Sequence, residues 1–341
     1  MKTIFAVDDS DTNLSLAKKA LEENYRILTM PSAVKMFTLL EKITPDLILL
    51  DIEMPELNGV DAFKKLKAHH VYGQIPVIFL TGRNDTAIEA KCFELGAVDF
   101  ITKPFSAPVL LNRIKTYLNI DEIIHERTEQ LQRLQSGIVS VLADIVESRD
   151  KETEGHIERT VAYIRILLEA MQERGVYADE IASWDIETVI LSARLHDMGK
   201  IVVSDVVLNK HDKLTGDEYV AIRSHADEGV RIIDKMVEQT GEADFLRNAK
   251  LFAGYHHEYW DGSGYPHGLK GTDIPLQGRI MAIVDSYDAL ISRRPYKEAM
   301  AVEEAERIIM ENAGKQFDPD IARVFFEVRK QFKEVAARIE G

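Results

Sequence analysis

Histidine and carboxylate side chains in the C-terminal half of the sequence have the types and spacing of metal ligands. His196 and Asp197 are adjacent, and a second doublet, His256 and His257, precedes the glycine-rich stretch DGSGYPHG. Imidazole and carboxylate groups without thiolates favour iron, manganese, cobalt, nickel or zinc over a structural cysteine–zinc site. The candidate ligands are Glu152, His156, His196, Asp197, His225, His256, His257 and Asp285. Because so many ligands exceed the needs of one tetrahedral ion, the sequence predicts two metal ions, or three.

A second acidic group lies at the ends of short apolar runs near the N-terminus. Asp8 and Asp9 follow the first run, Asp51 ends the third, Thr81 ends the fourth, and Lys103 follows the fifth. Since the carboxyl ends of parallel strands meet at one edge of a sheet, these side chains are expected to converge. Carboxylate oxygens suit Mg²⁺. A carboxylate beside Mg²⁺ and a lysine can act as a nucleophile toward a phosphoryl group.

The elements that must position these residues differ between the two halves. Residues 1–120 alternate apolar runs (TIFAVDD, DLILLD, PVIFLTG, DFITKP) with amphipathic stretches, which predicts a doubly wound, flavodoxin-like α/β domain with a parallel five-stranded sheet. From Ile138 onward the pattern is almost wholly helical, and His196 with Asp197 is expected on a helix. The predicted domains are residues 1–120, a linker helix over 121–145, and an all-α domain over 138–341.

The linker sequence carries a heptad pattern, in which apolar residues fill two seams for about three and a half heptads. One seam contains Ile124, Leu131, Ile138 and Ile145, and the other contains Ile120, Leu134 and Val141. Arg127 is the one polar residue in these seams. A parallel two-stranded coiled coil that joins two protomers would use such seams. The alternative is a single helix that buries one stripe against its own domain.

Composition limits the classes of function. A chain of 341 residues with 45% hydrophobic content suits two packed domains. The net charge of −15 argues against general nucleic-acid binding, because no basic surplus displaces counterions. No apolar run has the length of a membrane helix, and the start MKTIFAVDDS does not resemble a signal peptide. The lone cysteine, Cys92, suits a reducing cytoplasm.

The N-terminal pattern resembles the receiver domain of bacterial response regulators. VDDS, LLDIEMPELNG, FLTG and DFITKPF carry the resemblance, over residues 1 to about 120. It implies a cognate sensor histidine kinase that phosphorylates Asp51. It also assigns roles to the neighbouring residues: Asp8, Asp9 and Asp51 for Mg²⁺, Lys103 for the phosphoryl group, and Thr81, Phe100 and Lys103 for the switch that reports phosphorylation.

The C-terminal pattern resembles the HD-GYP family of metal-dependent phosphohydrolases. LHDMGK, HHEYWDGSGYPHGL and DSYDALISRRPYK carry this resemblance, over residues 138 to about 320. It implies hydrolysis of cyclic di-GMP to linear pGpG, GMP or both, at a site loaded with iron or manganese. By the same resemblance the eight candidates are the ligands, Asp197 bridges two ions, and Glu152 marks members with three. GGDEF proteins are implied as candidate partners.

Several residues near the ligands are candidates for catalysis or substrate binding. Asp197 and Lys200 are the catalytic candidates. A lysine beside the metals can neutralise the charge of the phosphodiester or protonate its leaving oxygen. The substrate-binding candidates are Lys200, Arg294, Lys297, Gly264, Tyr265 and Pro266. Gly262 and Gly264 are expected to allow positive φ and close approach of a bulky ligand. Two segments depart from the common pattern of the family. This chain has LNKHDKLT in place of LNKPGKLT and IVVSD in place of IGIPD, and neither change affects a candidate metal ligand.

The leading hypothesis is a cytoplasmic, dimeric cyclic di-GMP phosphodiesterase controlled through Asp51. A first alternative is a catalytically silent adaptor that binds cyclic di-GMP or a protein through the glycine-rich loop. A second alternative is hydrolysis of another substrate, such as a hybrid cyclic dinucleotide. The complete ligand set favours the enzyme over the adaptor, whereas competition among cyclic dinucleotides would separate the two enzymatic hypotheses.

Overall fold

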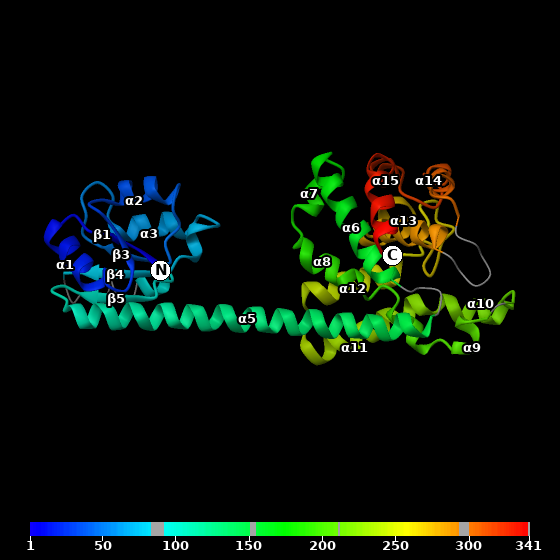
Figure 1. Ribbon diagram of the computed structural model, residues 1–341, viewed down its shortest axis with the longest axis horizontal. Helices are drawn as coiled ribbons and strands as arrows, with labels where there is room; N and C mark the ends of the chain where they lie inside the picture. The colour runs from blue at the N-terminus through cyan, green and yellow to red at the C-terminus, as the bar shows by residue number, and fades with distance from the viewer. Residues whose placement is uncertain (83–91, 151–154, 211, 293–299, 340–341) are drawn as a thin grey trace. The chain divides into compact units, whose positions relative to one another are not determined.

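Two compact units make up the chain. The computed structural model describes residues 1–82, 92–150, 155–210, 212–292 and 300–339. The units are Met1–Leu131 and Gln132–Gly341 (Figure 1). Each unit has its own hydrophobic core.

The N-terminal unit is built on a parallel five-stranded sheet. Its strands lie in the order β2-β1-β3-β4-β5, which is the flavodoxin-like order and confirms the predicted fold class. The strand bounds are β1 Thr3–Val7, β2 Arg26–Met30, β3 Leu47–Asp51, β4 Val77–Thr81 and β5 Asp99–Thr102. β3 and β4 are buried along their whole length, as expected for central strands covered on both faces.

Helices cover both faces of this sheet. The described helices are α1 (Asp11–Leu21), α2 (Ala33–Leu40), α3 (Gly59–Lys67), the 3₁₀ helix η1 (Tyr72–Gln74) and the start of α5 (Ala107–Arg149). Successive strand residues point to opposite faces, so Ile4 packs with α1 and α5, whereas Phe5 packs with α2 and α3. The two layers leave the carboxyl ends of the strands free to carry polar side chains.

Helix α5 is one continuous helix from Ala107 to Arg149. It therefore includes both the last helix of the sheet domain and the predicted linker. Val139, Ala143 and Val146 lie in the part of α5 that belongs to the C-terminal unit, and they are buried there. The heptad residues face elsewhere and are exposed, with fractions from 45% for Ile120 to 65% for Leu131. The stripe that packs against the helix's own unit is thus not the heptad stripe.

The C-terminal unit is helical, which confirms the all-α prediction. After α5 its elements are α6 (His156–Glu173), α7 (Ala178–Ile181), α8 (Ile186–Ala193), η2 (Met198–Val202), α9 (Asp205–Leu208), α10 (Gly216–Arg223), α11 (His225–Thr240), α12 (Asp244–Tyr255), η3 (Gly271–Asp273), α13 (Leu276–Ile291), α14 (Val302–Glu311) and α15 (Pro319–Ile339). The main core joins α6, α13 and α15 around Tyr163, Tyr287 and Phe332. A second cluster joins α5, α11 and α12.

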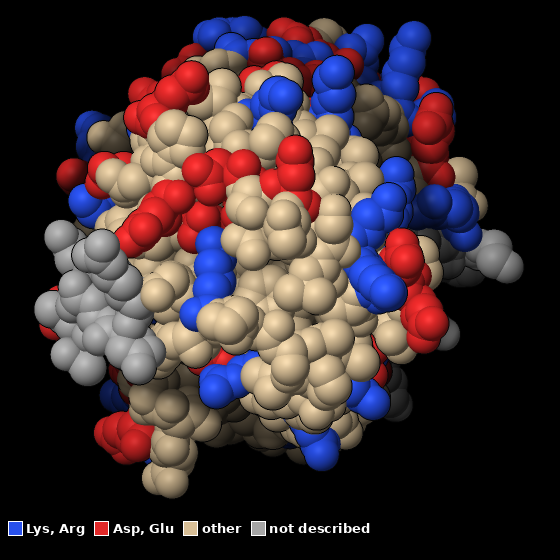
Figure 2. Space-filling view, turned by 90° about the vertical axis from the view of Figure 1, so that its left-hand side faces the viewer, with Lys and Arg blue, Asp and Glu red and all other residues tan. Residues whose placement is uncertain are grey.

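The surface carries charges of both signs. The face in Figure 2 shows acidic and basic side chains beside one another, with uncharged areas between them. Among the described residues, no helix has the length and apolar character needed to cross a membrane.

Candidate functional site

Helix ends bring most of the candidate metal ligands together. His156 and His225 are the first residues of α6 and α11, and His256 follows the end of α12. The expectation that His196 and Asp197 lie on a helix is wrong, because both occupy the turn between α8 and η2. A turn releases both side chains from one helical face, so each can reach a different neighbour.

One candidate metal group consists of His156, His196 and Asp285. Its ligand atoms all lie within 4.8 Å of one another. The Nε2 atoms of His156 and His196 are 3.3 Å apart, and His156 Nε2 lies 3.7 Å from Asp285 Oδ1. Both histidines are buried, and Asp285 reaches them from α13. Two imidazoles and a carboxylate fit a divalent transition metal.

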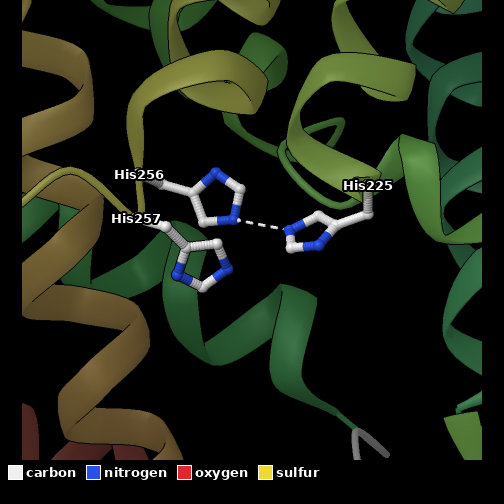
Figure 3. Close-up of side chains that lie close together, drawn as sticks. All are labelled: His225, His256 and His257. Atoms are coloured by element: carbon white, nitrogen blue, oxygen red, sulfur yellow. Dashed lines mark hydrogen bonds between the residues drawn. The ribbon is translucent and has the colours of Figure 1, made fainter. Parts of the chain in front are cut away.

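The second candidate metal group consists of His225, His256 and His257, whose ligand atoms also lie within 4.8 Å of one another. Figure 3 shows the three rings converging from α11 and from the segment after α12. The Nε2 atoms of His225 and His256 are 3.2 Å apart. Their Nδ1 atoms face backbone carbonyls of Ile222 and Phe252, at 2.6 Å and 2.9 Å. A carbonyl at Nδ1 orients the ring and leaves Nε2 for a metal.

Asp197 lies between the two groups. Its Oδ2 is 3.4 Å from His196 Nε2, in the first group. Its Oδ1 is 3.5 Å from His225 Nε2 and 3.8 Å from His256 Nε2, in the second. One carboxylate therefore presents an oxygen to each group, which is the arrangement that a bridging ligand requires.

The electrostatics of the second group suit neutral histidines. Burial, reinforced by the neighbouring histidines, lowers the pKa of His256 to about 3. Burial also lowers the pKa of His225 and, with His256 nearby, that of His257. Metals bind neutral imidazole, so these rings need not lose a proton at neutral pH. This property fits the group for a metal ion.

Lys200 is held beside the shared carboxylate. It lies in the 3₁₀ helix η2, where three residues make a turn, so it returns to Asp197, with Nζ 2.8 Å from Oδ2. Asp150, at the end of α5, accepts a second bond from Lys200 at 2.9 Å. Although burial favours the neutral amine, Asp197 and Asp150 raise the pKa of Lys200 above its usual value. Lys200 is therefore a fixed positive charge at the site.

Asp288 is a site residue that the sequence analysis missed. Its Oδ2 lies 2.8 Å from His156 Nδ1, and Arg159 Nε donates to its Oδ1 at 2.6 Å. Asp288 is three residues after Asp285 on α13, so both point to the same helix face. The phrase DSYDAL contains this spacing, which is the signal that could have identified Asp288.

We expect Asp288→Asn to weaken metal binding at the first group by about 10- to 100-fold, the usual effect of losing a carboxylate that orients a histidine. The amide cannot hold His156 with Nδ1 protonated as strongly as the carboxylate does. Metal titration of the purified variant measures the change. The matched control is Asp234→Asn, because Asp234 is part-buried and, among the described residues, pairs with Lys250 of the neighbouring helix α12. Equal metal affinity in the two variants would contradict the role of Asp288.

The glycine-rich loop is shaped by its own contacts. Gly262 has φ +86°, as expected, but positive φ is wrong for Gly264. A Cβ at Gly264 would lie 2.2 Å from Tyr259 N and 2.6 Å from His257 O, so this glycine permits close packing within the loop. The buried Glu258 carboxylate accepts from two loop amides, at 2.7 Å and 3.0 Å. These contacts hold Tyr265, whose ring stacks on His257 with centroids 4.7 Å apart; Pro266 is the next residue in this loop.

The N-terminal unit has an acidic site at the carboxyl ends of its strands. Asp8, Asp9 and Asp51 have ligand atoms within 4.8 Å of one another. Lys103 Nζ lies 2.7 Å from Asp8 and 2.6 Å from Asp51. Burial raises the pKa of Asp51, although Lys103 opposes the shift. Thr81 ends β4 and is buried.

The remaining predicted site residues either lie away from these clusters or fall outside the residues that the structure describes. Phe100 lies in β5 and packs edge-on against Phe93, with centroids 5.5 Å apart. Three candidates fall outside the described residues: Glu152, Arg294 and Lys297.

Comparison with known proteins identifies both units. Residues 4–115 match the family model "Response regulator receiver domain", and residues 140–321 match "HD domain". A probable cyclic di-GMP phosphodiesterase of Vibrio cholerae is 40% identical over 98% of this chain and 80% of its own length. The cyclic di-GMP phosphodiesterase response regulator RpfG of Xanthomonas campestris is 29% identical over 98% of this chain and 90% of its own. A 3′3′-cGAMP-specific phosphodiesterase of Vibrio cholerae is 32% identical over 66% of this chain and 40% of its own.

Proposed function

The chain belongs to the HD-domain family and carries a response regulator receiver domain, and on that premise we propose that it hydrolyses cyclic di-GMP under the control of phosphorylation at Asp51. The observation that carries the proposal is the pair of metal groups with Asp197 facing both. The cyclic di-GMP phosphodiesterase names of relatives that align along nearly the whole chain support the choice of substrate.

Each part of the site has a proposed task. His156, His196 and Asp285 hold one divalent ion, and three histidines hold the second: His225, His256 and His257. Bound divalent ions polarise a phosphodiester and activate water. Lys200, fixed and charged, neutralises the phosphodiester or supplies a proton to the leaving oxygen. Arg294 and Lys297 are proposed phosphate contacts, and Gly264, Tyr265 and Pro266 a substrate-facing loop.

The identity and number of the ions are further proposals. Imidazole and carboxylate ligands support iron or manganese, and Glu152 is proposed as a ligand of a third ion. In the receiver domain, the all-oxygen group of Asp8, Asp9 and Asp51 supports Mg²⁺. There Lys103 is proposed to contact the phosphoryl group of Asp51, with Thr81 and Phe100 as the switch pair. A sensor histidine kinase would supply the phosphoryl group.

The end of α5 provides a physical route for control. Arg149 donates to the carbonyl oxygens of Ile201 and Val203 around η2, at 2.5 Å and 2.9 Å, and pairs with Asp205 at 2.7 Å. Asp150 pairs with Lys200. We propose residues 1–120 as the input, 121–145 as the connecting helix and 138–341 as the output. A shift of the helix then moves η2, and with it Lys200.

The exposed heptad stripe of α5 supports a homodimer. Apolar side chains at both seams are open to solvent, and a second copy of the helix would bury them. We expect Leu131→Glu/Leu134→Glu to convert the dimer to a monomer, because like charges would meet inside the seam. Light scattering during gel filtration measures the mass. Gln132→Glu/Gln135→Glu adds the same charges outside the seams and should leave the dimer intact; a double seam variant that stays dimeric would refute this interface.

Two finer proposals concern surroundings and partners. Use of a single cysteine, buried at Cys92, supports a cytoplasmic location. GGDEF proteins are proposed as partners of the glycine-rich loop.

A second candidate activity is hydrolysis of 3′3′-cGAMP, which the name of one relative favours.

The test is anaerobic incubation of purified protein with Mn²⁺ or Fe²⁺ and cyclic di-GMP, followed by chromatography of the products. We expect metal-dependent formation of linear pGpG, GMP or both, and no product from the His196→Ala/Asp197→Ala variant. Parallel reactions with 3′3′-cGAMP rank the two substrates. Binding of cyclic di-GMP without turnover, with and without a phosphoryl mimic at Asp51, would instead identify a silent adaptor.

A further inference from the structure

Arg223 occupies a fixed position at the edge of the second metal group. It ends α10, whose start is held by a capping box between Thr215 and Glu218. Two residues later α11 begins at His225, a member of that group. The same backbone turn therefore positions both the exposed arginine and a candidate metal ligand.

Aromatic rings hold the Arg223 guanidinium. Its central carbon lies 4.5 Å from the ring centroid of Tyr219 and 4.6 Å from that of Tyr265. Tyr265 in turn stacks on His257. Cations over aromatic faces are attracted by the ring electrons, so the guanidinium is positioned before any ligand arrives.

Arg223 differs from the other described cations around the site. Lys200 is engaged by Asp197 and Asp150, and Arg159 by Asp288. In the part of the chain that the structure describes, no carboxylate pairs with Arg223; its one side-chain hydrogen bond there is a long one, 3.5 Å, to the Tyr219 hydroxyl. The edge of its guanidinium is thus available to a ligand.

Among the described residues, Arg223 contacts the rings of Tyr219 and Tyr265, which favours a base over the reacting phosphodiester as that ligand. The ring of Tyr265 contacts the Arg223 guanidinium and also stacks on His257, a member of the metal group. In a cyclic dinucleotide the bases project outward from the phosphate–ribose ring, so a base extends beyond the metals when a phosphodiester sits on them. The fork of an arginine matches the two acceptors O6 and N7 of guanine, whereas adenine presents a donor beside N7.

We infer that Arg223, positioned by Tyr219 and Tyr265, recognises a guanine of the substrate and sets the preference for guanine over adenine in cyclic dinucleotides. This inference rests on the proposed function and adds a specificity-determining residue to it. Tyr219 is a positioning residue, because it acts through Arg223.

The test compares cyclic di-GMP with cyclic di-AMP on metal-loaded full-length protein. Binding is measured by filter retention before turnover, and cleavage is followed in the same samples by chromatography. Wild-type protein should prefer cyclic di-GMP, and Arg223→Ala should reduce the ratio of the two affinities by about 10- to 100-fold. Arg223→Lys should reduce it similarly, because lysine keeps the charge but loses the fork. Tyr219→Ala should reduce it less.

The control is Arg231→Ala, since Arg231 is an exposed arginine on α11 that pairs with Glu228; its ratio should match the wild type. Equal weakening of both dinucleotides by Arg223→Ala would overturn the inference in favour of phosphate binding, and an unchanged ratio would overturn it outright. Wild-type protein that binds cyclic di-GMP selectively but never cleaves it would refute the proposed activity and leave this inference standing.

Discussion

Replacing Asp197 with asparagine should lower kcat/KM for cyclic di-GMP by about 10³-fold or more. The variant retains the shape of the side chain but loses the charge that faces both metal groups. Among the described residues, it also leaves Asp150 as the carboxylate that pairs with Lys200. Stabilisation of several kcal/mol at a metal centre depends on such charges, and about 4 kcal/mol corresponds to a thousandfold change in rate.

Steady-state kinetics at saturating Mn²⁺ measure this loss, and metal analysis of the same samples separates lost binding from lost chemistry. The control is Asp234→Asn, which removes one negative charge from a part-buried ion pair between Asp234 of α11 and Lys250 of α12. Activity of Asp197→Asn within tenfold of the wild type would exclude a shared carboxylate from the mechanism.

Replacing Arg149 with alanine should abolish most of the effect of phosphorylation on activity. Coupling between two sites is typically worth 1–3 kcal/mol, or about 5- to 150-fold. The Arg149 side chain joins α5 to η2 and to Asp205, so its loss should separate the helix from Lys200. We expect the wild-type rate to change by an amount in this range on phosphorylation, and the Arg149→Ala rate to change by less than about twofold.

Activity is measured before and after treatment with a small-molecule phosphodonor. Asp51→Asn serves as the control that cannot be phosphorylated and should show no response. Arg133→Ala is the matched control, because Arg133 is an exposed arginine on the same helix. A full response in Arg149→Ala would show that the signal travels by another route.

The sequence was sufficient for the fold class because its periodicities are simple. Fully apolar strands and acidic strand ends predicted the parallel sheet and the convergence of Asp8 and Asp51, which Lys103 now bridges. The helical character of the second half was equally clear. Spacing alone, however, placed His196 and Asp197 on a helix, whereas a turn between α8 and η2 carries them.

Contacts between distant segments could not be read from the sequence. The spacing in DSYDAL could have marked Asp288 as a candidate, but its contact with His156, 132 residues away, is visible only in the structure. Arg223 was not among the sequence candidates, because its contact with Tyr265 of the glycine-rich loop cannot be seen in the sequence. Gly264 was explained by a ligand, but the atoms that exclude a side chain there belong to the loop itself.

The central claim is that Asp197 joins the two metal groups into one centre that cleaves a cyclic dinucleotide. Its most direct test is the initial rate of cyclic di-GMP hydrolysis by metal-free protein as Mn²⁺ is added in known equivalents per chain. The account predicts little activity at one bound ion and a steep rise once the second binds. Full activity with one ion, or no activity when both groups are filled, would contradict it.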